Sequence, residues 1–303
     1  MRVLVTGAGG YVGRAVVREL RARGHRVVAL VHRSPATFPE DVETRRGDLH
    51  DPLREIAADI DGAVHLAARS TVRDSVTHPT LAWRTNVAGT LNLLDALPTP
   101  ARLVFASTGS VYGRPAQQPI SETAVVAPLN PYGSSKAAAE QLIDAQAATG
   151  ALGAVTMRLF NAAGAVDGRA DEDPSRIIPR VAAVAAGIEP VVTVNGDGSA
   201  VRDFVHVADI AVAVALGLEA ATPGQHKIYN LGAVPASVAD IVDAMVHASG
   251  RPVKVEHRPA NPHEAPELRA DTSRIRAELG WAPTRTTIDE LVADQWTAVT
   301  GSR

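Results

Sequence analysis

The stretch "VLVTGAGGYVG" (residues 3–13) constrains the possible folds more than any other segment of the chain. A short apolar run leads directly into Gly7, Gly10 and Gly13, and the residues that follow read as a helix. This order of strand, tight turn and helix lets backbone and helix amides approach a pyrophosphate closely. Glycines also serve ordinary turns, but here all three elements occur in the required order. We therefore predict a dinucleotide-binding unit at this end of the chain.

The same alternation of strand and helix continues through the first half of the chain. A typical helix is expected over 12–23, with Gly24 as its C-terminal cap. The predicted strands show no polar face, which favours a parallel sheet buried on both sides. We predict an α/β fold, a Rossmann-type doubly wound parallel sheet with a smaller C-terminal substrate-binding lobe. The strands of this sheet are expected at 3–5, 27–31, 63–68, 103–107 and 155–160.

The composition changes after about residue 160, where "DGRADEDP" and "NGDGS" indicate loops. Prolines at 252, 259, 262, 266 and 283 mark the C-terminal part. "KIYNLG" (227–232) reads as a strand that returns to the main sheet. We therefore predict a dinucleotide-binding domain of residues 1–160 plus about 204–232, and a lobe of residues 161–203 and 233–303.

Charge and cysteine content exclude several classes of function. A net charge of −3 gives no electrostatic basis for binding nucleic acid or an anionic membrane. The chain has no cysteine, which rules out a cysteine nucleophile, a thiolate metal site and disulfides. The ten histidines show no metal-ligand spacing, so no metal is predicted. The most apolar run, 210–218, is too short to span a bilayer, and no secretory signal precedes the first strand, so a cytoplasmic protein is expected.

The end of the second predicted strand bears on cofactor choice. A carboxylate at this place would bind the ribose hydroxyls of NAD, but the chain has Val31, His32 and Arg33 there. Arg33 could pair with the additional phosphate of NADP or be a solvated surface charge, and the sequence leaves both interpretations open. Asp48, in "GDL", could accept a hydrogen bond from the adenine amino group.

Tyr132 and Lys136 are separated by one helical turn and therefore share a helix face. A phenol has a pKa of about 10, so a tyrosine that acts as a base near neutrality needs a cation beside it. Lys136 supplies that cation, and the Thr108 hydroxyl could link the phenol to a substrate oxygen. The spacing alone also occurs by chance in a surface tyrosine and lysine.

Taken together, the motifs resemble the extended short-chain dehydrogenase/reductase family over nearly the whole chain. They are the N-terminal TGxxGxxG pattern, "HLAA" (65–68), "NVAGTLNLLDA" (86–96), "STGSVYG" (107–113) and "PYGSSK" (131–136). Within that family, "RLFNAAGA" (158–165), "IIP" (177–179), "AVRDFVHVADIA" (200–211) and "YNLG" (229–232) are similar to the UDP-glucose 4-epimerases.

The resemblance implies a 4-epimerase. Such an enzyme transfers a hydride from sugar C4 to tightly bound NAD and then returns it to the opposite face of the sugar. The implied catalytic residues are Thr108, Tyr132 and Lys136, with Tyr132 as the acid/base and Lys136 on the nicotinamide ribose. The implied cofactor-binding residues are Gly7, Gly10, Tyr11, Val12, Gly13, His32, Arg33, Asp48, Leu49, Leu66, Ala67, Ala68, Asn86, Tyr132, Lys136 and Phe160. The implied substrate-binding residues are Thr108, Ser110, Tyr132, Asn161, Arg176, Asn195, Arg202, Arg258, Asn261 and Leu268, with Arg202 and Arg258 on the diphosphate of a UDP-sugar.

Several residues depart from the family pattern. Val31 replaces an acidic residue, which leaves NADP possible beside NAD. Asn195 replaces an aromatic residue near the base, and Asn261 replaces an acidic residue. Leu268, at a position that gates 2-acetamido sugars by size, favours plain hexoses.

Two other functions remain as alternatives. An NADPH-dependent nucleotide-sugar 4-ketoreductase would suit His32 and Arg33, and a non-catalytic nucleotide-binding sensor would keep the fold. A 4,6-dehydratase is disfavoured, because Gly109 and Ser110 stand where that group has an Asp-Glu pair. The resemblance also implies a homodimer formed through the helices around 80–97 and 132–149.

Overall fold

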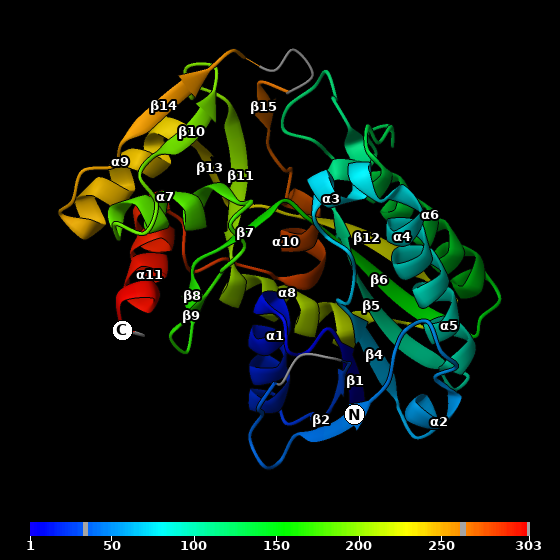
Figure 1. The fold of residues 1–303 in the computed structure, drawn as a ribbon. Coiled ribbons are helices and arrows are strands. Elements are labelled where there is room, and N and C mark those ends of the chain that lie inside the picture. The colour runs from blue at the N-terminus through cyan, green and yellow to red at the C-terminus, as the bar shows by residue number, and fades with distance from the viewer. Residues whose placement is uncertain (33–35, 261–264, 302–303) are drawn as a thin grey trace.

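The computed structural model describes residues 1–32, 36–260 and 265–301. Its centre is a seven-stranded, wholly parallel sheet with the strand order β12-β6-β5-β4-β1-β2-β3 (Figure 1). Its strands are β1 (Arg2–Thr6), β2 (Arg26–Val31), β3 (Glu43–Arg46), β4 (Gly62–His65), β5 (Ala101–Thr108), β6 (Leu152–Leu159) and β12 (His226–Leu231). The prediction of a Rossmann-type doubly wound sheet is confirmed.

The strand order reverses between β1 and β4. From β1 the chain adds β2 and β3 on one side, and then β4, β5, β6 and β12 on the other. In an open α/β sheet, such a reversal leaves a crevice at the carboxyl ends of the two central strands, because the connecting segments diverge there. This topology determines where a ligand site can form.

Two apolar layers cover the sheet, and alternate residues of β1 enter different layers. Val3 and Val5 pack against α1 (Tyr11–Ala22) and α8 (Val207–Ala220). Leu4 faces the opposite layer, with Leu93 and Ile143. Because successive side chains of a strand point to opposite faces, an apolar run that shows no alternation is buried on both sides.

The helices of the opposite layer are α2 (Arg54–Ala57), α5 (Gly89–Ala96) and α6 (Pro131–Ala148), and α10 (Ser273–Leu279) lies on the α1 side. The predicted helix around 80–97 is divided into α4 (Pro79–Trp83), a π-helical turn η1 (Arg84–Ala88) and α5. α3 (Val72–Thr77) precedes it, and a 3₁₀ turn η2 (Gly109–Tyr112) follows β5. Figure 1 shows α4, α5 and α6 side by side.

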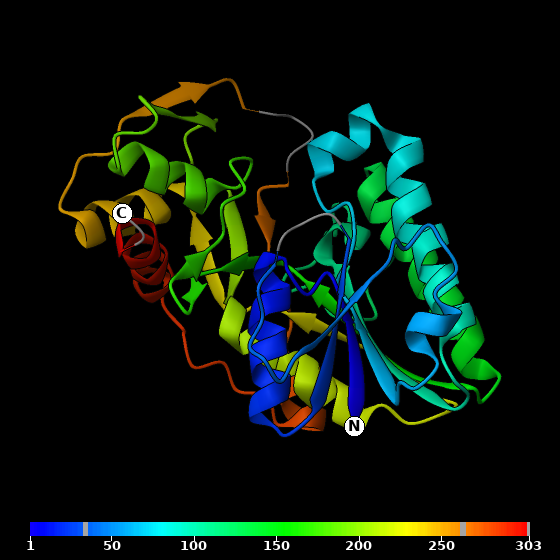
Figure 2. The same cartoon turned by 60° about the horizontal axis from the view of Figure 1, so that its bottom comes forward.

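A second group of elements, which we call the smaller lobe, lies beside the sheet (Figures 1 and 2). Its core joins Val181, Phe204, Met245 and Leu291. We predicted residues 204–232 as part of the larger domain. β11, which overlaps that range, instead pairs with β7, β13 and β15 of the smaller lobe. β12, in the same range, lies in the central sheet. The elements of the smaller lobe are β7 (Asn161–Ala163), β8 (Ala165–Val166), β9 (Arg169–Ala170), α7 (Ile177–Ala185), β10 (Val192–Asn195), β11 (Val201–His206), β13 (Val234–Ser237), α9 (Val238–Ser249), β14 (Val255–Arg258), β15 (Glu267–Leu268) and α11 (Ile288–Gly301).

Candidate active site

A large cleft of about 1360 Å³ lies over the carboxyl ends of the central strands. Thr6 and Gly7 follow β1, Leu66 follows β4, and Thr108 ends β5 at its floor. Residues of the smaller lobe, including Ile178 and Phe204, complete the wall. The cleft therefore lies at the reversal point of the sheet and opens to both groups of elements. It contains most of the predicted site residues: Gly7, Gly10, Tyr11, Val12, Gly13, His32, Asp48, Leu49, Leu66, Ala67, Ala68, Thr108, Ser110, Tyr132, Lys136, Phe160, Asn161 and Arg176.

The glycine-rich turn has the shape that a dinucleotide requires. Gly7 has φ +70°, and a Cβ there would lie 2.8 Å from the Ala67 amide nitrogen. A Cβ on Gly13 would lie 2.1 Å from the Gly7 carbonyl oxygen, so only glycine lets α1 pack on the turn. Neither a capping side chain nor an acidic residue occupies the first turn of α1. Its amides and positive helix end therefore face the cleft without an internal anion, which fits a pyrophosphate.

The side of the cleft next to β2 has no carboxylate at the strand end. Val31 is buried, and the first polar group is His32, whose Nε2 lies 3.0 Å from Asp48 Oδ2. Asp48 Oδ1 accepts a hydrogen bond from the His50 amide at 3.0 Å. Asp48 thus lines the cleft and is already hydrogen bonded, and its contact with adenine stays a prediction. Arg33 lies outside the described residues.

His65 of "HLAA" holds the end of β4 in place. The Thr90 hydroxyl donates to the Asn86 carbonyl oxygen, so His65 Nε2–H must be the donor in its 3.0 Å contact with Thr90. The Thr6 hydroxyl then donates to His65 Nδ1 at 2.7 Å and accepts the Ala67 amide at 3.1 Å. Burial, followed by the Lys136 charge, lowers the pKa of His65 to about 3, so this histidine is neutral.

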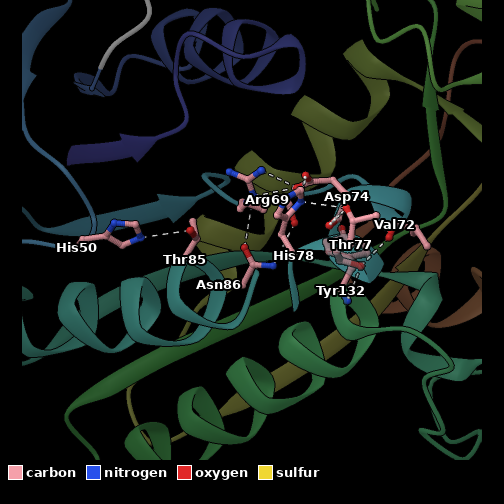
Figure 3. A network of polar contacts seen from close by, with 10 residues as sticks. His50, Arg69, Val72, Asp74, Thr77, His78, Thr85, Asn86 and Tyr132 are labelled. Carbon is pink, nitrogen blue, oxygen red and sulfur yellow. Dashed lines mark hydrogen bonds and ion pairs between the residues drawn. The ribbon is translucent and has the colours of Figure 1, made fainter. Parts of the chain in front are cut away.

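Asn86 lies behind the cleft wall and not on it. Its Oδ1 accepts the Arg69 amide at 2.8 Å, and its Nδ2 donates to the Ser135 hydroxyl at 2.9 Å. The Ser75 hydroxyl, in turn, accepts the Tyr132 amide at 3.2 Å. Figure 3 shows Asn86 bonded to Arg69, and Tyr132 at the start of α6 next to α3. Asn86 therefore positions this segment against the helix that carries Tyr132.

Asn130 and Pro131 begin α6 and fix Tyr132 in its first turn. The Asn130 side chain accepts the Gly133 amide at 2.8 Å as an N-cap, and Pro131 occupies the first helical position. Tyr132 lines the cleft together with Thr108, whose hydroxyl is close enough to influence the pKa of the phenol. Burial raises the pKa of Tyr132, whereas the Thr108 hydroxyl and the Arg176 charge lower it.

Lys136 is almost fully buried one turn after Tyr132. Its Nζ donates to the Ala106 carbonyl oxygen at 2.7 Å and lies 4.4 Å from the centre of the Phe105 ring. Burial lowers the pKa of Lys136 to about 7, and Glu140 opposes this shift. The ammonium and the neutral amine are therefore both accessible near neutrality.

A buried polar network lies beneath Lys136, and our sequence reasoning did not include it. Glu140, one turn after Lys136, pairs with Arg158 of β6 at 2.6 Å and accepts a hydrogen bond from the Ser107 hydroxyl. Arg158 also donates to the Tyr112 hydroxyl at 2.8 Å, which donates to Asn230 at 2.7 Å. A charged residue inside the apolar run 155–160 was the available signal, because a buried arginine needs a partner.

The predicted substrate residues fall into two sets. Ser110, Phe160, Asn161 and Arg176 line the cleft with Tyr132. Arg176 pairs with Asp171 at 2.8 Å, and burial raises the pKa of Asp171 while Arg176 lowers it. The second set, Asn195, Arg202, Arg258 and Leu268, lies on β10, β11, β14 and β15 of the smaller lobe and does not line the cleft wall. Asn261 lies outside the described residues.

Asp203, which sequence reasoning did not single out, connects Asn161 of the cleft to backbone segments of the smaller lobe. Its carboxylate accepts the amides of Ala233 at 2.7 Å, Val234 at 3.0 Å and Ala270 at 2.9 Å. Its own carbonyl oxygen accepts the Asn161 side-chain amide at 2.8 Å. Asp203 thus joins Asn161 of the cleft to the strand that carries Leu268.

Comparison with known proteins identifies relatives along the full chain. The family model described as the NAD dependent epimerase/dehydratase family matches residues 3–232. A UDP-glucose 4-epimerase of Streptomyces lividans is 38% identical over 97% of this chain and 95% of its own length. A UDP-glucose 4-epimerase of Corynebacterium glutamicum is 36% identical over 100% of this chain and 98% of its own length.

A solved structure has the same fold over the same extent. It is the UDP-glucose-4-epimerase from Stenotrophomonas maltophila with bound NAD and formylated UDP-arabinopyranose. It matches with a TM-score of 0.90 and 31% identity, covering 100% of this chain and 99% of that protein. The larger sheet and the smaller lobe are therefore both shared with this structure.

Proposed function

Because this chain belongs to the NAD-dependent epimerase/dehydratase family, we propose that it is a nucleotide-sugar 4-epimerase that interconverts UDP-glucose and UDP-galactose. The observation that carries the proposal is Tyr132 in the cleft beside Thr108, with Lys136 buried one helical turn away. The relatives with that activity match the chain over nearly its whole length.

Tyr132 would take the proton of the sugar 4-hydroxyl and later return it. Thr108 would hold the phenol through a hydrogen bond and present its hydroxyl to the same substrate oxygen. When the Lys136 amine is protonated, its positive charge stabilises the Tyr132 phenolate, because an adjacent cation favours a charged oxygen. Proton transfer by a positioned side chain contributes roughly 10²–10⁴-fold to a rate.

Two features of the cleft fit NAD. The turn at Gly7 and Gly13 has no space for a side chain at either glycine. The first turn of α1 has neither a capping side chain nor an acidic residue that would occupy its amides. Gly7, Gly10 and Gly13 would hold its pyrophosphate, and Asp48 would accept a hydrogen bond from its adenine. Lys136 would contact its nicotinamide ribose, while Leu66, Ala67 and Ala68 line the neighbouring wall. When bound, NAD supplies reversible hydride acceptance from sugar C4.

The UDP-sugar would lie between the two groups of elements. Ser110, Asn161 and Arg176 would contact the hexose side, and Arg202 and Arg258 the diphosphate side. Leu268 packs against Val111, Tyr112 and Ile120 next to the site, a place from which it would limit the size of the sugar substituent. The division into a domain of residues 1–160 plus about 204–232 and a lobe of residues 161–203 and 233–303 supports this placement and stays a prediction.

The first test uses the protein as purified, with no cofactor added. It is denatured, the released nucleotide is identified, and a parallel native sample is incubated with UDP-glucose or UDP-galactose. We expect NAD and interconversion of the two sugars. An empty protein that binds NADPH and leaves both sugars unchanged would contradict the proposal and favour a ketoreductase. Binding without turnover on any nucleotide sugar would favour a sensor.

We also propose a homodimer formed through α4, α5 and α6. Trp83 on α4 and Leu91 on α5 are 42% and 44% exposed, which is unusual for large apolar side chains unless a partner covers them. Light scattering at working concentration would give the mass of one chain if this proposal is wrong.

Within the described residues, no helix is long and apolar enough to cross a membrane. A cytoplasmic location remains a prediction from the sequence.

A further inference from the structure

Three arginines from three different elements lie near one another beside the cleft, and of these Arg73 lines it. Arg73 lies on α3 and lines the cleft, Arg180 lies on α7, and Arg258 ends β14. The Arg180 guanidinium donates to the Thr193 carbonyl oxygen of β10 at 2.8 Å. β10 and β14 are paired so that Asn195 stands opposite Arg258. Arg180 is therefore held beside the strand end that carries Arg258.

The guanidinium of Arg180 is repelled by two others. Burial, then the charges of Arg73 and Arg258, lowers the pKa of Arg180, so Arg180 is close enough to interact with each of the other two. Among the described residues, none of the three forms an ion pair with a carboxylate. This distinguishes them from Arg69 and Arg176, which lie in the same cleft but are paired with Asp74 and Asp171. Like charges that converge without a counterion are unfavourable until an anion joins them.

The position of Arg73 indicates which anion this is. Ser75, two residues further along α3, contacts the backbone amide of Tyr132. In a pyranose, the C4 hydroxyl and the C1 phosphate oxygen are attached at opposite ends of the ring. Residues two apart on a helix do not share a face, so Arg73 does not lie on the Ser75 face that contacts Tyr132. An anion held by Arg73 is therefore displaced from the phenol that would take the C4 proton.

We propose that Arg73 and Arg180, together with Arg258, clamp the diphosphate of the nucleotide-sugar substrate from two sides of the cleft. The proposal rests on the proposed function and adds to it two residues that the family motifs do not include. Arg73 comes from the sheet side and Arg180 from the smaller lobe, so the anion joins the two groups of elements. Guanidinium groups suit this role, because their planar donors can bind phosphate oxygens in pairs.

The test compares the affinities of UDP and UMP for the cofactor-containing protein by calorimetry at two salt concentrations. The variants are R73Q, R180Q and their combination, with R73K to keep the charge without the planar donors. R26Q is the matched control, because Arg26 is exposed at the start of β2, the end of the sheet remote from the cleft. We expect R73Q and R180Q each to weaken UDP binding about tenfold. UMP binding should change less than about threefold, and the salt dependence of UDP binding should become shallower.

Unchanged UDP affinity in folded R73Q and R180Q would overturn the clamp. A loss confined to UDP-glucuronate, with UDP unaffected, would overturn it as well and would assign the arginines to a carboxylate on the sugar. Wild-type protein that binds no UDP would refute both the clamp and the proposed function. Wild-type protein that epimerises UDP-glucose, with variants that bind UDP normally, would refute the clamp alone.

Discussion

The charged residues on the floor of the cleft and those at its mouth differ in whether they are paired within the protein. On the floor, Lys136, Glu140 and Arg158 are buried, and each has a partner within the protein. At the mouth, which Arg73 lines, Arg180 lies near both Arg73 and Arg258, and none of the three is paired with a carboxylate in the described part of the chain. The charges of the floor are therefore balanced within the protein, whereas those of the mouth are not.

The difference follows from what each region must do. A group that exchanges a proton with substrate must be held in one geometry, which requires a supporting network with no unsatisfied member. A group that binds a charged ligand is most useful when no internal partner competes for it. The floor should therefore determine rate and stability, and the mouth should determine affinity.

Replacement of Tyr132 by phenylalanine is the most direct way to break this comparison. It removes the proton-exchanging hydroxyl but leaves the ring and the start of α6 in place. We expect kcat to fall by roughly 10²–10⁴-fold, with the affinity for UDP unchanged. Activity of the purified variant on UDP-galactose measures this directly. A loss of less than tenfold would mean that another group exchanges the proton.

Replacement of Glu140 by glutamine tests the network of the floor. It leaves the buried charge of Arg158 without its counterion, which typically destabilises a protein by about 3–5 kcal/mol. Chemical denaturation of wild type and variant gives the difference in their free energies of unfolding. The double variant E140L/R158M removes both charges and should recover most of the lost stability. A single variant as stable as wild type would show that the pair is not structurally coupled.

Replacement of Lys136 by methionine tests the pKa of the buried amine. The folded-state pKa of about 7 lies below the unfolded value of about 10.4. Between these values the unfolded chain binds one proton more, so wild-type stability should rise with pH by up to about 1.4 kcal/mol per unit. The difference in the free energy of unfolding between wild type and variant, measured on cofactor-free protein from pH 7 to 10, isolates the contribution of Lys136. A flat difference would place the pKa of Lys136 at its ordinary value.

The smallest expected effect concerns the stability of the mouth. Arg73→Gln removes a charge with no carboxylate partner, so the free energy of unfolding should change by less than about 0.5 kcal/mol. Thermal unfolding without ligand checks this against R26Q. A clear destabilisation would show that Arg73 belongs to the permanent structure, and the distinction between floor and mouth would fail at that residue.

The parts of the fold that depend on local sequence were predictable. The glycine turn, the helix with Gly24 beyond its end, and the strand at residues 226–231 all appear close to their expected limits. Tyr132 and Lys136 lie one turn apart on α6, whose start Asn130 and Pro131 mark in the sequence. Each of these features is determined by a few neighbouring residues.

The missed features join residues that are far apart in the chain. Arg158 meets Glu140 only because β6 packs against α6, and Asp203 meets Ala233 and Ala270 only in the folded smaller lobe. Periodicity carries no information about such pairs. The helix expected around 80–97 is present, but its π turn was missed for a related reason, because Asn86 in that turn contacts Arg69 and Ser135, which are distant in the sequence.

That π turn makes the site depend on the length of a segment as well as on its residues. A π turn spans one residue more than an α turn, and each residue of an α-helix rotates the chain by about 100°. Loss of any single residue between Arg84 and Ala88 would let α4 run straight into α5 with both helices still facing their present partners, but it would remove or reorient the residues of the turn itself, Asn86 among them. A homologue with one residue fewer here would have to hold Arg69 and α6 by a different side chain. Among related sequences, gaps in this segment should therefore be rarer than substitutions.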